Sequence, residues 1–76
     1  MMEPSEGVLR VLRESGEGLH WTKIQDEALR KGYLDPFEHP DVRRQVQTAL
    51  RRLADAGSIE RIGKGVYRAA TQPDEA

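Results

Sequence analysis

The sequence predicts a single small α+β domain that is mainly helical and ends in a small β-hairpin. Apolar residues recur with helical spacing in three segments, which predicts three helices. Beyond them, SIERIGKGVYRA contains two runs rich in β-branched and aromatic residues around Gly63-Lys64-Gly65, which is typical of a hairpin. With 76 residues, of which 37% are hydrophobic, the chain has room for only one small core.

The first helix is expected to run from Glu6 to Ser15. The Ser5 hydroxyl can cap its first turn by accepting a hydrogen bond from a free backbone amide, and Gly16 can end it. The next stretch, GEGLHWT, contains two glycines that favour a turn and then a short extended segment over residues 19–21.

The second helix is expected to begin at Thr22. Thr22 and Gln25 have the spacing of a capping box, in which each side chain bonds the backbone amide of the other residue. Gly32 follows two basic residues that suit the negative end of a helix dipole, so it is expected to end this helix.

A linker, GYLDPFEHP, separates the second helix from the third. Tyr33, Leu34 and Phe37 are the apolar residues that it can contribute to the core. Pro40 suits the first position of the third helix, because its fixed backbone angle matches a helical start. Asp41 beside it suits the positive end of the helix dipole.

The third helix, expected over residues 41–56, has an apolar face and a basic face. At about 100° per residue, the core side holds Val42, Val46, Ala49, Leu50 and Leu53. The opposite side carries the residue types that read base edges in a major groove, namely Arg44, Gln47, Thr48 and Arg51. Arg43 and Arg52 lie on the shoulders, where they can hold phosphates. An ordinary solvated face is the alternative, because arginine is also a good helix former, and Asp55 does not fit DNA binding.

The predicted hairpin adds positive charge after the third helix. Arg61, Lys64 and Arg68 are expected to contact phosphates, and Lys64 can approach a backbone closely because glycines flank it. The turn can be centred on either Gly63-Lys64 or Lys64-Gly65, so the register stays open. A soluble tight turn also explains Gly-Lys-Gly.

Charge is unevenly distributed along the chain, although the formal net charge is only −1. Residues 1–39 hold five Lys/Arg and eight Asp/Glu, whereas residues 40–70 hold seven and three. Residues 71–76 hold two acidic residues and are expected to form a disordered tail, and residues 1–4 a flexible N-terminus. The folded domain is therefore expected over residues 5–70. Such asymmetry can mark one anion-binding face, although it also arises without function.

Catalysis, metal binding and membrane insertion find no support in the sequence. The absence of cysteine excludes a disulfide and a thiolate metal site, and His20 and His39 lack zinc-ligand spacing. No glycine-rich phosphate loop follows a strand, and the adjacent carboxylates Asp26 and Glu27 point in different directions on a helix. No apolar run approaches the roughly 18 residues that span a bilayer. We therefore expect a cytoplasmic protein that is not an enzyme and has no cofactor or small-molecule substrate.

The order of elements resembles a winged helix-turn-helix domain over residues 5–70. Residues 41–56 take the recognition-helix position, and Gly63-Lys64-Gly65 takes the wing tip. More narrowly, LHWTKIQDEALRKGYL and VRRQVQTALRRL resemble the HARE-HTH group of winged helices, and GSIERIGKGVYRA is similar to the wing of small prokaryotic regulators, including antitoxin N-terminal domains. His39 departs from this pattern, because the HARE-HTH group usually has Thr or Ser before the helix proline. The linker is also longer than the turn of a simple helix-turn-helix.

The resemblance and the charge distribution together favour a small prokaryotic transcriptional regulator that binds double-stranded DNA. The third helix is expected in the major groove, and the wing along a phosphate strand or minor groove. The competing hypothesis is a protein-interaction module or an accessory subunit of a transcription or DNA-processing complex, since winged helices also bind proteins. Its surface would combine an acidic face, formed by Asp26, Glu27, Asp35 and Glu38, with an apolar patch around the linker. The residues of that patch would be Trp21, Tyr33, Leu34 and Phe37. Homodimerisation also stays open.

Overall fold

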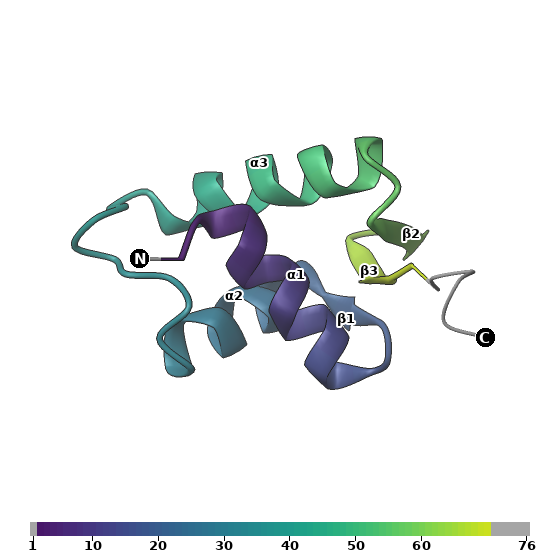
Figure 1. Ribbon diagram of the computed structural model, residues 1–76, viewed down its shortest axis with the longest axis horizontal. Helices are drawn as coiled ribbons and strands as arrows, with labels where there is room; N and C mark the ends of the chain where they lie inside the picture. Colours follow the sequence, from purple (N-terminus) through teal and green to yellow (C-terminus); the bar gives the residue numbers. More distant parts are fainter. Residues whose placement is uncertain (1, 71–76) are drawn as a thin grey trace.

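The computed structural model describes residues 2–70 as three helices and a three-stranded antiparallel sheet (Figure 1). The elements are α1 (Pro4–Ser15), β1 (Leu19–His20), α2 (Trp21–Arg30), α3 (Val42–Asp55), β2 (Ile59–Gly63) and β3 (Val66–Ala69). The predicted fold class and element order, those of a winged helix-turn-helix, are confirmed. The expected disordered tail, residues 71–76, lies outside the described residues.

The core lies between the three helices and one face of the sheet. In Figure 1, α3 runs along the top, α1 crosses the centre, α2 lies below and the hairpin is at the right. The largest fully buried side chains are Leu12, Ile24, Leu50, Val8, Val11 and Val46. Burial of each such side chain contributes on the order of 1.5–3 kcal/mol. The predicted apolar face of α3 is confirmed, because Val46, Ala49, Leu50 and Leu53 are buried and Val42 is half-buried.

The sheet has the strand order β1-β3-β2, so β3 is the strand of the hairpin that pairs with β1. Gly63 pairs with Val66, which places the turn at Lys64-Gly65 and settles the hairpin register. Gly65 has φ 71°, a left-handed conformation that glycine adopts without steric cost. The register shifts between Arg61 and Gly63, which leaves Ile62 as the extra residue of a β-bulge.

Two predicted helix starts in the first half of the chain are wrong. Helix α1 begins at Pro4 rather than Glu6, and Ser5 lies inside its first turn instead of capping it. Proline fits there because its missing amide is one that a helix leaves unpaired in any case. Helix α2 begins at Trp21, and its cap is His20, whose Nδ1 accepts a hydrogen bond from the Thr22 backbone amide (3.3 Å). The predicted capping box at Thr22 is therefore replaced by a histidine cap.

The start of α3 and the packing of its linker also differ from expectation. Helix α3 begins at Val42, and Asp41 is its cap, with Oδ1 accepting from the Arg44 amide (3.3 Å), so Pro40 precedes the helix. An aspartate carboxylate satisfies a first-turn amide, which proline cannot do. In the linker, Leu34 is buried as predicted, but Phe37 is 92% exposed. The Phe37 backbone amide donates to Asp35 Oδ1 (2.9 Å), which holds this residue in a turn outside the core.

Candidate nucleic-acid interface

The outward face of α3 presents the predicted base-reading side chains to solvent. Arg44, Gln47, Thr48 and Arg51 are all exposed, whereas the residues between them on the inner face are buried. Apolar residues recur along α3 with the helical period, so one side of the helix faces the core and the other side faces solvent. The 14-residue helix thereby carries core packing and a basic surface on opposite sides.

A hollow of about 300 Å³ lies between the C-terminal half of α3 and the hairpin. Gln47, Arg51 and the acidic Asp55 are among the residues that line it from α3, and Arg61 and Tyr67 line it from the two strands. Arg61 and Tyr67 are directly paired across the hairpin, and the Arg61 Nε donates to the Gly63 carbonyl oxygen (3.3 Å). The structure therefore brings two predicted base-reading residues and one predicted phosphate-binding residue to a single groove.

The opposite flank of α3 forms a different hollow with the start of α1 and the linker. Thr48 and Arg52 line it, together with Glu3, Ser5 and His39 among other residues. Thr48 and Gln47 are adjacent in sequence but open onto different flanks. The predicted contact set is thus divided by the helix, because successive residues lie about 100° apart around its axis.

Arg43, at the start of α3, stacks on an aromatic ring that begins α2. Its guanidinium carbon lies 5.3 Å from the centroid of the Trp21 ring, within the range of a cation–π contact. The Trp21 backbone amide donates to the Gly65 carbonyl oxygen (2.8 Å), next to the exposed Lys64 at the hairpin turn. Arg43, Trp21 and the turn thus form one continuous set of contacts.

Arg68 is placed away from the α3 groove. Its Nε donates to Glu60 Oε1 (3.0 Å), and these two residues are partners across the hairpin. Side chains alternate between the two faces of a strand, so Glu60 and Arg68 lie on the face opposite Arg61 and Tyr67. On that face Arg68 lines a hollow that includes Arg13 of α1.

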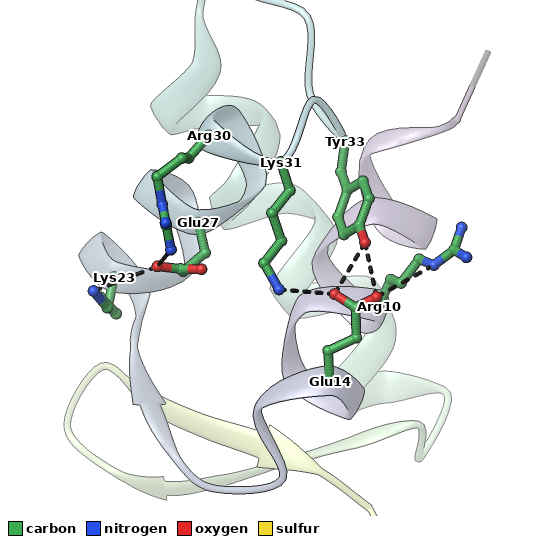
Figure 2. Close-up of polar contacts among 7 residues, drawn as sticks. All are labelled: Arg10, Glu14, Lys23, Glu27, Arg30, Lys31 and Tyr33. Atoms are coloured by element: carbon green, nitrogen blue, oxygen red, sulfur yellow. Dashed lines mark hydrogen bonds and ion pairs between the residues drawn. The ribbon is translucent and has the colours of Figure 1, made fainter.

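A second surface, on α1 and α2, contains carboxylates that are surrounded by cations. Figure 2 shows Glu14 of α1 facing the cation of Lys31 and the hydroxyl of Tyr33. Its Oε1 accepts from Lys31 Nζ (2.9 Å), its Oε2 accepts from the Tyr33 hydroxyl (2.7 Å), and Arg10 Nε lies 3.7 Å away. The Lys31 and Tyr33 hydrogen bonds hold the pKa of Glu14 below its ordinary value.

Glu27 of α2 is a second centre of the same kind (Figure 2). It forms ion pairs with Arg30 and with Lys23, whose Nζ lies 3.4 Å from Oε2. The hydrogen bond from Arg30 is the main reason that the pKa of Glu27 lies below its ordinary value. Glu14 and Glu27 are therefore each paired with two cations, which come from α1, from α2 and from Lys31 directly after α2.

Most of the positive charge of α3 and the hairpin has no such compensation within the described residues. Among residues 2–70, four of the five cations of the first half, Arg10, Lys23, Arg30 and Lys31, take part in ion pairs. Of the seven cations in residues 40–70, only Arg68 pairs with a carboxylate within the described residues. A run of unpaired cations produces a positive potential that attracts a polyanion.

Trp21 and Tyr67 are contact residues that the sequence did not identify as part of this surface. Trp21 joins α2 to α3 and the hairpin, and these contacts are remote in sequence, so no local pattern indicates them. Tyr67 is different, because its position opposite Arg61 follows from the hairpin register. Knowing that the turn is at Lys64-Gly65 would have placed Tyr67 opposite Arg61, and therefore beside the hollow between α3 and the hairpin.

Neither a metal cluster nor a membrane-spanning helix occurs in the part of the chain that the structure describes. Within residues 2–70, no group of three or more His, Cys, Asp or Glu residues is placed to hold a metal ion. No helix in this range has the length and apolar character needed to cross a bilayer.

The comparisons with known proteins point to the same part of the chain as the charge does. Residues 43–70 match the family model described as "Transcriptional regulator, AbiEi antitoxin". The match spans α3 and the hairpin, which is less than half of the chain, so it is a partial likeness to a family of regulators rather than of enzymes. The predicted similarity to antitoxin regulators is confirmed for this segment, whereas the HARE-HTH resemblance stays a prediction. The searches of curated proteins and of solved structures found no match.

Proposed function

We propose that the protein is a small prokaryotic transcriptional regulator that binds double-stranded DNA through α3 and the hairpin. The observation that carries this proposal is the unpaired positive charge of these elements, set against the neutralised charge of α1 and α2. The match of residues 43–70 to a regulator family supports the same surface.

In the proposed complex, α3 lies in the major groove of the DNA. One phosphate strand of the DNA runs along the hollow between α3 and the hairpin. Gln47 and Arg51 approach base edges from the side of α3 that faces this hollow. Arg44 approaches them from the outer surface of α3, and Thr48 approaches them from its other flank. Each well-placed bidentate base contact gives about 1–3 kcal/mol of discrimination. Phosphates are held by Arg43, Arg52, Arg61 and Lys64. Arg68 is left out, because it pairs with Glu60 on the far face of the hairpin.

A selection from a pool of random duplexes, followed by titration of the selected duplex, tests this pose. Arg51→Ala is expected to lower affinity for that duplex by roughly 10-fold or more, since the side chain is proposed to contact base edges. Arg13→Ala, which removes an exposed arginine from α1, is the matched control and is expected to leave affinity unchanged. Unchanged binding of Arg51→Ala to every duplex tested would rule out this pose.

A second candidate function, a protein-interaction module, is favoured by one observation. Phe37 is 92% exposed on an ordered turn, and the acidic residues Asp35 and Glu38 flank it. An exposed, pre-positioned aromatic side chain is a suitable anchor for an apolar pocket, and the flanking carboxylates fit a pocket with a basic rim.

Photo-crosslinking from residue 37 in cells that make the protein tests this second function. A discrete protein adduct from residue 37, but not from the exposed residue 17 on the loop after α1, would support it. An adduct of twice the mass of the chain would indicate a homodimer through the linker. The same adduct pattern from both positions, or none from residue 37, would contradict a specific contact.

A further inference from the structure

Trp21 lies where the starts of α2 and α3 meet the turn of the hairpin. Its backbone amide donates to the Gly65 carbonyl oxygen (2.8 Å), and its ring lies under the guanidinium of Arg43, 5.3 Å from centroid to carbon. A Cβ added to Gly65 would lie 3.2 Å from Trp21 Cδ1 and 3.0 Å from His20 Nε2. The hairpin turn is therefore packed directly against the start of α2.

His20 fixes the start of α2 on which Trp21 stands. His20 Nδ1 lies 2.8 Å from Thr22 Oγ1 and accepts from the Thr22 backbone amide at 3.3 Å. The His20 and Trp21 rings have centroids 5.8 Å apart, so the two aromatic groups also pack on each other. The position of the Trp21 ring is thus determined by a helix cap, a neighbouring ring and a bond to the hairpin.

The cation–π contact with Trp21 orders the Arg43 side chain without using its hydrogen-bond donors. The guanidinium lies over the Trp21 ring, a contact that uses none of its N–H groups as hydrogen-bond donors and so leaves them for an anion. Among residues 2–70, Arg43 has no carboxylate within ion-pair distance, so those donors are not engaged by a charged partner. A long side chain that is already ordered also loses less conformational entropy when a ligand binds.

We propose that Trp21 is a positioning residue, which holds Arg43 and the Lys64-Gly65 turn in one arrangement for joint contact with the phosphodiester backbone of DNA. This inference rests on the proposed function and identifies how two phosphate contacts from different elements act as a unit. Trp21 itself touches Arg43 and the turn. Trp21 is half-buried and packs against the edge of the core, whereas the core residues themselves are buried.

A double-mutant cycle with Trp21→Leu and Arg43→Ala, read out as duplex affinity at several salt concentrations, tests this coupling. Trp21→Leu keeps the backbone bond from residue 21 to Gly65, so it is expected to lose mainly the ordering of Arg43. Each single variant should therefore weaken binding and reduce the slope of log affinity against log salt by about 0.9, the value of one phosphate contact. The double variant is expected to bind within about twofold of Arg43→Ala, because the two residues act together. Trp21→Phe keeps an aromatic face and is expected to restore most of the affinity.

The control for the cycle is a second cation–π pair on the neutralised surface. Arg10 lies 5.4 Å from the centroid of the Tyr33 ring, much as Arg43 lies from Trp21. Arg10→Ala is expected to change neither the affinity nor the salt slope. A merely structural role of Trp21 would make the effects of Trp21→Leu and Arg43→Ala multiply, and that result would overturn the proposal.

The fluorescence of the wild-type chain gives a second readout that does not depend on the folding of a Trp21 variant. Trp21 is the only tryptophan in the sequence, so its emission reports on this site alone. Saturating duplex is expected to shift the emission of the wild type, and Arg43→Ala is expected to abolish most of that shift. DNA binding without any shift would overturn the proposal alone, whereas absence of DNA binding by the wild type would overturn both it and the proposed function.

Discussion

Two surfaces of the molecule carry similar kinds of residues, one on α1 and α2 and the other on α3 and the hairpin. They differ in whether their cations are paired with carboxylates. On the first, the Glu14 and Glu27 carboxylates each lie among several cations (Figure 2). On the second, the arginines of α3 and the turn lysine have no ion-pair partner within residues 2–70. A formal net charge of −1 hides this difference, because the two halves nearly cancel.

The difference shows that ion pairing, rather than arginine content, separates the proposed binding surface from the other surface. Exposed ion pairs contribute little to stability, so the pairs on α1 and α2 mainly remove net charge from that surface. Unpaired cations on α3 repel one another in the free protein, and an anion that binds them relieves this repulsion. The predictions below alter one surface while leaving the other intact.

Charge reversal on α3 is expected to have the largest effect. Arg44→Glu combined with Arg51→Glu should lower affinity for duplex DNA by about 100-fold or more, because two contacts become repulsive. Arg10→Glu combined with Arg13→Glu changes the net charge equally on α1 and should lower affinity by less than about fivefold. Anisotropy titrations of one labelled duplex at a fixed low salt concentration compare them. Equal losses from both variants would remove the distinction between the surfaces.

Two adjacent residues of α3 distinguish its buried face from its proposed DNA-binding face. Leu50 is 1% exposed, and Leu50→Ala should lower the free energy of unfolding by about 2–5 kcal/mol, since it leaves a cavity in a small core. Arg51→Ala should change it by less than about 0.5 kcal/mol while weakening DNA binding. Urea denaturation followed by circular dichroism measures both. A large loss of stability in Arg51→Ala would mean that its side chain supports the fold.

Two glycines with positive φ test how firmly the hairpin turn is held against α2. Gly65→Ala and Gly57→Ala both place alanine in the left-handed region, at φ 71° and 80°, which costs about 1–2 kcal/mol. Only at Gly65 would the new Cβ also contact His20 and Trp21, whereas nothing lies within 4 Å of it at Gly57. Gly65→Ala should therefore lower the free energy of unfolding more, in the same urea assay. A larger loss in Gly57→Ala would contradict the packing described for the turn.

The smallest expected effect is the dependence of stability on pH at Glu14. Its pKa is lower in the folded chain than the ordinary 4.5, so ionised Glu14 stabilises the fold above pH 4.5. That contribution is lost as the pH falls through the lowered pKa. The Tm of wild type should thus exceed that of Glu14→Gln slightly at pH 7, and the difference should shrink in acid. A difference that does not change with pH would contradict this role, and DNA affinity at pH 7 should be unaffected.

Patterns that repeat locally were sufficient to predict the fold and the faces of α3. The spacing of Val46, Leu50 and Leu53 predicted the buried side, and it therefore placed Arg44 and Arg51 in solvent. The helical period alone determines which side chains are exposed, because a residue on the face opposite the core points into solvent. The hairpin was also predictable, since its glycines and β-branched residues determine a turn between two strands.

Helix starts and contacts between distant segments were not predictable in this way. A cap depends on which of several neighbouring polar groups satisfies a free amide, and His20 did so in place of Thr22. At the third helix Asp41 is the cap, so the helix begins at Val42 and not at Pro40. Phe37 is an apolar residue of a type that is usually buried, but the turn at Asp35 holds it outside the core. The stacking of Arg43 on Trp21 requires α2 and α3 to be positioned by the whole fold.

The most direct test of the unpaired basic surface is the salt dependence of binding to a labelled mixed-sequence duplex, followed by fluorescence anisotropy. Contacts from Arg43, Arg52, Arg61 and Lys64 predict tight binding at low salt and a log–log slope of about −3 to −4, at roughly 0.9 per phosphate. Absence of binding at low salt, or a slope near zero, would contradict the account and leave this face of α3 as solvated surface.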